Sequence, residues 1–285
     1  MTIGYLTMKT RVISLLLMLV MIRGSVSYCQ SDSLQEQSGS RFSLGGSFGV
    51  SDAHQLDNYL SPFVFDGVHF ASKISFLIES GRSRHTIEAF YSQGPLSSDP
   101  QPRDVTQHVG YFSYSYVYSL AAPKPGEDGV RFSLGGGISS FVMQTDFNTT
   151  DETHYTTYDQ SWYWAHSVNL VCSGGYEFSA RKYISLRVTI PIALLVSRPA
   201  NERWMNSNNA AVSDNFAKAA TQGSMEYAWD SFDLFADLEF RYPLGGDFDI
   251  LATYRFGYVS SSKPASILSM GMYMNTYLAG ILWSF

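Results

Sequence analysis

The sequence has little cysteine and, beyond its first 30 residues, no hydrophobic run long enough to cross a membrane as a helix. Its two cysteines are Cys29 and Cys172. A spanning helix needs about 20 apolar residues in succession, and nothing after residue 30 approaches that length. These shortages argue against a disulfide-stabilised domain and against a helical membrane protein.

Basic residues are also scarce. The chain contains 19 Lys and Arg against 25 Asp and Glu, and three of the basic residues lie before position 30. Without residues 1–29 the chain would keep 16 basic and 25 acidic residues, a net charge of −9. We therefore expect no nucleic acid among its partners.

The first 29 residues have the pattern of an export signal. They contain no acidic residue, carry Lys9 and Arg11, and continue into an apolar run at 12–22. This run matches the core of about 7–15 residues that is typical of signal peptides. We expect a signal peptide at 1–29, which is removed, and one domain at 30–285.

The cleavage site follows from the small residues at the end of this segment. Ser27 and Cys29 fit a small-x-small pattern that leaves Gln30 as the first mature residue. Lipidation of Cys29 is an alternative, which the bulky Tyr28 disfavours. Met8 is a second possible start.

Alternation of apolar and polar residues is the main structural signal. Aromatic residues make up 15% of the chain, with 19 Tyr and 19 Phe, and period two is typical of strands. In the clearest segment Ile184, Leu194 and Val196 belong to one apolar face. The ten segments with this pattern are 41–50, 68–79, 85–92, 105–120, 130–143, 161–178, 183–196, 229–242, 248–260 and 269–285.

These segments are long for soluble strands and match the ten or so residues that cross a bilayer at a tilt. The links between them alternate in length. Short links are expected at 80–84, 121–129, 179–182 and 243–247; longer ones are expected at 51–67, 93–104, 144–160, 197–228 and 261–268. With an even strand count, both termini lie on the side of the short links.

The chain ends inside such a segment. Tyr277, Ala279, Ile281, Trp283 and Phe285 occupy alternate positions on one face. In this feature the chain resembles bacterial outer-membrane β-barrels, whose last strand ends in an aromatic residue preceded by alternating apolar residues. The resemblance covers essentially the whole chain and identifies a class. It implies an outer-membrane location with periplasmic termini, recognition of these five residues by the barrel-assembly machinery, and periplasmic chaperones as partners.

The predicted fold is all-β, a transmembrane antiparallel up-and-down β-barrel of ten strands. Inside hydrocarbon, each unpaired backbone group costs several kcal/mol, so the sheet must close on itself. A water-soluble sandwich could also alternate, but its links would not separate by length. Interface girdles explain the tyrosine and tryptophan clusters, which include Tyr111, Tyr114, Tyr116, Tyr118, Trp162, Trp164, Tyr254, Tyr258, Tyr273 and Tyr277.

If the apolar face meets lipid, the polar face lines the lumen, where charges of both signs should pair and close it. A narrow charged pore is the alternative. The charged residues expected on this face are Arg41, Lys73, Glu79, Glu88, Arg131, Glu177, Arg187, Asp233, Asp237, Glu239, Arg241 and Arg255.

No catalytic constellation, metal or cofactor is predicted. The ten-stranded protease family needs an Asp pair and an Asp–His pair at the outer rim. Asp247-x-Asp249 lies at a short link instead, and we expect no Asp-x-His at the rim. His166-Ser167 does not provide the His-x-Ser of lipid A deacylases, whereas a dispersed His, Asp and Ser set of the palmitoyltransferase type stays open.

Two further binding hypotheses come from the histidines and tryptophans. His54, His69, His108, His154 and His166 map to the outer half, which invites a metal or haem site, but parity turns His69 inward and His108 and His166 outward. Stacking on sugars by Trp162, Trp164, Trp204 or Trp229 is possible.

We expect an integral outer-membrane barrel without enzymatic activity, in contact with outer-membrane lipid and lipopolysaccharide. It would work through extracellular loops or as a structural or envelope-assembly subunit. A narrow channel for small solutes or ions and an enzyme that modifies lipids or peptides are the alternatives.

Overall fold

The computed structural model describes most of the chain after residue 39. The described residues are 40–58, 63–99, 104–123, 127–148, 160–178, 182–199, 212–213, 220–221, 223–227, 229–262 and 269–285. The expected signal peptide and cleavage site lie outside them. Within these ranges no helix is long and apolar enough to span a membrane.

Ten long strands and two short ones make up the domain. The long strands are β1 (Arg41–Asp57), β2 (Val64–Ser80), β3 (Ser83–Leu96), β4 (Asp104–Ala121), β5 (Gly129–Asn148), β6 (Gln160–Phe178), β7 (Lys182–Pro199), β10 (Ser231–Gly245), β11 (Phe248–Ser261) and β12 (Met270–Ser284). The short strands are β8 (Val212–Ser213) and β9 (Ser224–Tyr227). All ten predicted strands are confirmed.

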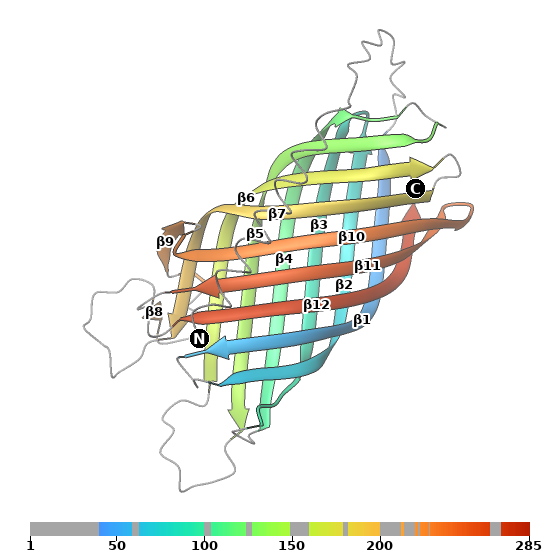
Figure 1. The fold of residues 1–285 in the computed structure, drawn as a ribbon. Helices are drawn as coiled ribbons and strands as arrows, with labels where there is room; N and C mark the ends of the chain where they lie inside the picture. Colours follow the sequence, from blue (N-terminus) through green and yellow to red (C-terminus); the bar gives the residue numbers. More distant parts are fainter. Residues whose placement is uncertain are drawn as a thin grey trace, which may run out of the picture. The chain divides into compact units, whose positions relative to one another are not determined.

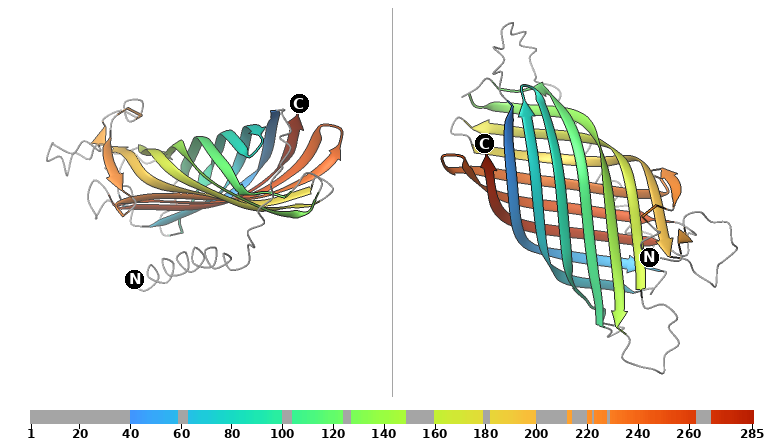
Figure 2. Two further views of the ribbon diagram at one scale, coloured as in Figure 1. Left: turned by 90° about the horizontal axis from the view of Figure 1, so that it is seen from above. Right: turned by 180° about the vertical axis from the view of Figure 1, so that it is seen from behind.

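The ten long strands close into one antiparallel barrel. Each pairs with its neighbours in the chain, β1 also pairs with β12, and β10 pairs with β7. Figure 1 and the two views of Figure 2 show this up-and-down order around the wall. The ten-stranded barrel is confirmed, and the sandwich alternative is excluded because one continuous sheet returns to its first strand.

Both ends of the barrel can be defined by the chain. The terminal end holds the start of β1, the end of β12 and the links 81–82, 122–128, 179–181 and 246–247; the far end holds the links after β1, β3, β5, β7 and β11. The strands run further towards the far end than predicted. The expected link 51–67 shrinks to 58–63, which is shorter than 122–128 at the terminal end, so link length separates the two ends less sharply than predicted.

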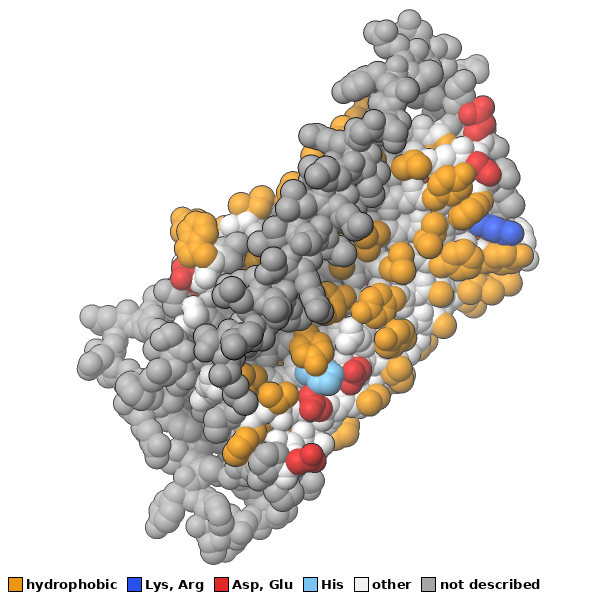
Figure 3. All heavy atoms as spheres, in the orientation of Figure 1, with side chains coloured by type: hydrophobic (Ala, Val, Ile, Leu, Met, Phe, Trp, Pro, Cys, Tyr) orange, Lys and Arg blue, Asp and Glu red, His pale blue; other side chains and the backbone are white. Residues whose placement is uncertain are grey.

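Apolar side chains cover the outside of the wall. Phe48, Val68 and Ile74 are each at least 60% exposed, and similar residues recur on every long strand. In Figure 3 hydrophobic side chains spread over the strands that face the viewer, and charged ones lie towards the ends. Water-soluble proteins rarely expose such a continuous apolar surface.

A bulge in β7 changes which face its apolar residues occupy. Ala193 pairs with Val168 on β6 and Pro191 pairs with Asn169, so Ile192 is an extra residue without a partner on β6. Beyond this bulge the parity of β7 is reversed. The prediction that Leu194 and Val196 share the outer face with Ile184 is therefore wrong, because both are fully buried inside the barrel.

The predicted long link 197–228 contains structure of its own. Beyond the Phe235–Thr189 pair β10 no longer pairs with β7, and β9 takes over its place from Ala193 to Val196. The strand predicted to begin at Trp229 begins at Ser231, because Trp229 lies in the turn between β9 and β10.

The interior of the far half contains a large apolar cluster, which the sequence pattern did not predict. Twenty buried apolar residues form one cluster, including Phe90, Tyr111, Phe141 and Phe235. The ring centroids of Tyr111 and Phe235 are 4.5 Å apart. Tyr111 was expected in an outer girdle and instead points inward, whereas Tyr114, Tyr116 and Tyr118 are exposed on the outside.

The pairing of β1 with β12, which closes the barrel, can be tested at Gly49, because this residue pairs with Leu278 of β12. A Cβ atom there would overlap the carbonyl oxygen of Tyr277, whereas a Cβ at Gly46 would meet nothing within 4 Å. We expect Gly49→Ala to lower the free energy of unfolding by about 1–3 kcal/mol and Gly46→Ala to change it by less than about 0.5 kcal/mol. Urea unfolding in detergent micelles, followed by tryptophan fluorescence, measures both. Equal effects would contradict the close approach of β1 and β12.

Candidate functional site

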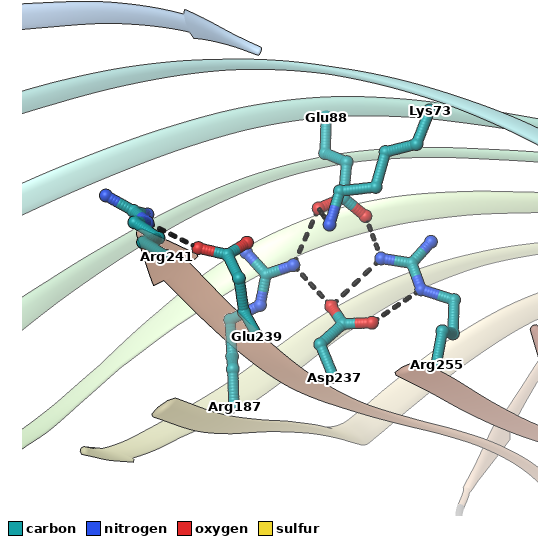
Figure 4. Close-up of polar contacts among 7 residues, drawn as sticks. All are labelled: Lys73, Glu88, Arg187, Asp237, Glu239, Arg241 and Arg255. Carbon is teal, nitrogen blue, oxygen red and sulfur yellow. Dashed lines mark hydrogen bonds and ion pairs between the residues drawn. The ribbon is translucent and has the colours of Figure 1, made fainter. Parts of the chain in front are cut away.

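A buried cluster of five charged residues crosses the middle of the lumen. Arg187 of β7, Asp237 of β10 and Arg255 of β11 lie directly opposite one another across three neighbouring strands. Lys73 of β2 and Glu88 of β3 reach them from the other side of the barrel, as Figure 4 shows. Strands far apart in the sequence are therefore joined through their side chains.

The contacts within this central cluster are short. Arg255 Nε donates to Asp237 Oδ1 at 2.6 Å, and Arg255 Nη2 donates to Asp237 Oδ2 at 2.9 Å and also to Glu88 Oε1. Arg187 Nη2 donates to Glu88 Oε2 at 2.6 Å and to Asp237 Oδ2 at 2.5 Å. Lys73 Nζ lies 3.3 Å from Glu88 Oε2. Such charge-assisted contacts fix the side chains across the lumen.

Three cations share two carboxylates in the cluster, and nearby aromatic rings stabilise the excess positive charge. The guanidinium carbon of Arg255 lies 5.2 Å from the ring centroid of Phe90 and 5.3 Å from that of Tyr111. A cation over an aromatic face is stabilised when water is excluded. Arg255 thus connects the charged layer of the lumen to the apolar layer of the far half.

The other charged residues form separate pairs nearer the terminal end. Arg84 pairs with Glu79 at 2.5 Å, Arg131 with Glu177 at 2.5 Å and Arg241 with Glu239 at 2.6 Å. Of the twelve charged residues expected on the polar face, the structure joins Lys73, Glu88, Arg187, Asp237 and Arg255 in the central cluster. Arg131, Glu177 and Glu239 lie outside it. Arg41 is exposed at the strand end.

A small cavity remains between these pairs. It measures about 40 Å³ and is lined by Arg84, Glu88, Arg187, Asp237, Glu239 and Arg241 together with small polar residues. This volume holds water but no organic ligand. Its lining carries three positive and three negative side chains, so it has no preference for ions of one sign.

A second polar layer lies inside the far end and was not predicted. Arg198 donates to Asp57 Oδ1 at 2.6 Å, and Ser161 donates to Asp57 Oδ2 at 3.0 Å. Asp233 was expected among the paired charges but accepts a hydrogen bond from Tyr163 at 3.0 Å. Asp57 and Arg198 were not predicted to lie inside the barrel, because the sequence pattern places both positions in links rather than strands.

The histidines are dispersed. His69 is fully buried in the lumen, where its Nδ1 lies 3.1 Å from Ser92 Oγ. His108 contacts Tyr91 on the outer face, and the Nε2 of His166 lies 2.8 Å from the Ala220 carbonyl oxygen. The predicted orientations of these three residues are confirmed; His154 lies outside the described residues. In the described ranges no three His, Cys, Asp or Glu residues are grouped to hold a metal ion.

His54 corrects the expectation that the rim carries no Asp-x-His. It lies in β1 rather than in a link, with Nε2 3.0 Å from Asp52 Oδ2 and Nδ1 in contact with Asp66. Its ring stacks on Tyr273 at 4.2 Å. This cluster faces outward beyond the apolar belt, and both ring nitrogens are directed at carboxylates.

The tryptophans named for sugar stacking differ in exposure. Trp162 is buried, Trp164 contacts His166, and Trp229 is 80% exposed and stacks on Tyr227 at 4.9 Å. Trp204 lies outside the described residues.

The five C-terminal residues expected to guide assembly share the outer face of β12. Tyr277, Ile281, Trp283 and Phe285 are exposed, and the Phe285 ring stacks on Phe42 of β1 at 6.1 Å. Phe285 and Phe42 also exchange two backbone hydrogen bonds. The segment is therefore part of barrel closure, and its recognition by an assembly machinery stays a prediction.

Comparison with known proteins concerns the fold. No protein-family model matches the chain, and no curated protein matches it. Among solved structures, the outer membrane protease OmpT from Escherichia coli is 8% identical with a TM-score of 0.49, covering 89% of this chain and 99% of that one. Neisserial surface protein A is 12% identical with a TM-score of 0.35, over 87% of this chain and 99% of its own. These values assign no activity or ligand.

The contacts of the central cluster predict how much stability the protein loses when one of its carboxylates is replaced. Asp237→Asn leaves three buried cations facing one carboxylate, so we expect it to lower the free energy of unfolding by about 3–5 kcal/mol. Glu177→Gln, in a pair open to water, should lower it by no more than about 1 kcal/mol. Urea unfolding in vesicles compares the two variants. The central role of Asp237 would be refuted if both variants lost the same stability.

Proposed function

We propose that the protein is an integral outer-membrane β-barrel with a closed lumen and no enzymatic activity. It acts through the segments at its far end, either as a surface-binding protein or as a structural subunit of the cell envelope. The terminal end, with the start of β1 and the end of β12, faces the periplasm.

The exposed apolar belt supports the membrane location. Phe48, Val50, Phe70 and Ile74 point outward from β1 and β2, and Tyr277 and Ile281 continue the belt on β12. Transfer of apolar surface from water to hydrocarbon contributes about 25 cal/mol per Å². Lipid requires that a sheet pair its backbone groups by closing on itself and that its outer surface be apolar. The wall of this barrel is closed and carries an apolar belt.

The single observation that carries the closed lumen is the sequence of layers along its axis. The central cluster joins β2 and β3 to β7, β10 and β11 across the lumen, and the apolar cluster around Phe141 and Phe235 lies beyond it. An ion would have to break buried ion pairs and then cross an apolar layer. Either step is costly in a medium of low dielectric constant.

The rim supports a non-enzymatic role. A general base needs a nitrogen or oxygen that can take a proton from the reacting group. The two nitrogens of His54 are directed at Asp52 and Asp66, and Asp57 is bonded to Arg198 and Ser161. The partners that we propose are outer-membrane lipid and lipopolysaccharide, the barrel-assembly machinery and periplasmic chaperones.

Conductance in planar bilayers tests the closed lumen. We expect the purified chain to insert without a stable current, while an open porin in the same bilayer conducts. A steady current that disappears when Lys73 or Arg187 is replaced by Ala would show that ions pass the central cluster. That result would favour the narrow channel.

Deletion of residues 201–211 tests the action through far-end segments. We expect the shortened chain to keep its resistance to unfolding in unheated SDS, because the ten strands are intact, and to lose proteins that co-purify from native membranes. Deletion of 124–126 at the terminal end is the matched control. If the control loses the same partners and the first variant keeps them, the periplasmic side carries the function.

A further inference from the structure

A groove crosses the outside of the barrel wall near the far end. Neighbouring strands place five outward side chains in one row: Phe112 pairs with Ser140, Ser140 with His166, His166 with Leu195, and Leu195 with Met225. The groove along this row has a volume of about 380 Å³.

Two local features of the wall create the groove. The β7 bulge turns both Ile192 and Ala193 outward, and β9 adds a short wall beyond β7. Ser140 and Ala193 are small and form a low floor. Phe112 and Met225, which are 52% and 65% exposed, rise on either side.

The chemistry of the lining is specific. It contains no Asp, Glu, Lys or Arg, and most of its surface comes from apolar residues such as Ile138 and Val168. His166 Nε2 lies 2.8 Å from the Ala220 carbonyl oxygen, which can only accept. Nε2 therefore donates to this carbonyl, and Ser140 of β5 is the cross-strand neighbour of His166 on β6. An apolar groove with a histidine ring and serine residues in its lining suits a hydrocarbon chain that bears a polar group.

Depth in the membrane points to the same ligand. Trp164 lies two residues beyond His166, and the two rings are 5.9 Å apart. Tryptophan favours the boundary between hydrocarbon and headgroups, so the groove lies just inside that boundary. Acyl chains of lipopolysaccharide carry hydroxyl or ester oxygens a few carbons from the sugar, whereas phospholipid chains have none at this depth.

We propose that this groove binds one acyl chain of lipopolysaccharide. The proposal rests on the proposed function, because the far end must face the outer leaflet. The chain lies along Ile138, Val168 and Leu195, and its oxygen contacts Ser140 and His166. A plain chain would leave these two polar groups unpaired against hydrocarbon, which is unfavourable.

Native mass spectrometry of the detergent-purified full chain tests the groove. The protein is incubated with lipopolysaccharide or with phosphatidylethanolamine, and retained lipid is counted. We expect retention of lipopolysaccharide to fall at least about tenfold, or 1.4 kcal/mol, in Ala193→Phe, which fills the floor. Ala252→Phe, an exposed belt position on β11, is the matched control and should retain lipid as the unaltered chain does.

Two more variants separate the contributions. Ser140→Phe fills the groove from β5 and replaces Ala193→Phe if that variant does not fold. Ser140→Ala keeps the groove open, and we expect it to reduce the preference for lipopolysaccharide over phosphatidylethanolamine.

The outcomes distinguish the two proposals. Binding of lipopolysaccharide in the groove is refuted if the filled variants retain as much lipid as the unaltered chain. It is also refuted if both lipids are retained equally, or if the bound mass corresponds to a second copy of the chain. A folded, detergent-dependent barrel in those cases leaves the proposed function standing. A mature chain that is monomeric and folded in buffer without detergent overturns the proposed function itself.

Discussion

Pairing of backbone hydrogen-bonding groups around nearly the whole wall is the constraint on which the structure depends. β1 meets that demand from both sides, because it pairs with β2 and with β12 along nearly its whole length. The last strand, β12, pairs with β11 on one side, and its hydrogen-bonding groups on the other side find partners only in the first strand, β1. Where β7 and β10 part beyond Thr189 and Phe235, β9 supplies the missing partner. Closure also commits each strand to one face towards the surroundings and one face towards the lumen.

The lumen of such a barrel must be filled, and this chain fills it in two ways. The central cluster is held by directional contacts that span the barrel, and the apolar cluster beyond it is held by packing. Buried ion pairs contribute little net stability, but they fix the geometry of the groups that form them. Arg255 serves both layers, since it pairs with Asp237 and lies over the rings of Phe90 and Tyr111. The boundary between the layers is thus a single side chain with charged contacts on one side and aromatic contacts on the other.

Period-two alternation was sufficient to predict the ten strands and to direct Lys73, Glu88 and Arg187 inward, because both follow from strand geometry. The stagger between strands decides which charged side chains lie opposite one another across the lumen. Alternation of apolar and polar residues carries no information about this stagger. The apolar interior was missed for a related reason: on β12, Met272 and Met274 face inward while Tyr273 faces outward, so both faces are apolar there. The polar Asp52 and His54 were assigned to a link because a strand that extends beyond the apolar belt resembles a link in composition.

One extra residue in β7 explains much of what alternation could not predict. Pro191 has no backbone N–H to give to a neighbouring strand, and proline within sheets is found at edges and bulges. Ile192, the residue that follows it, has no partner on β6. The resulting change of parity sends Leu194 and Val196 into the apolar cluster, which adds to the layer that closes the lumen. The same change turns Ala193 outward beside Val168, where its small side chain leaves the floor of the groove low. The interior packing and the outer groove of this region therefore have a common origin in the local chemistry of a single proline.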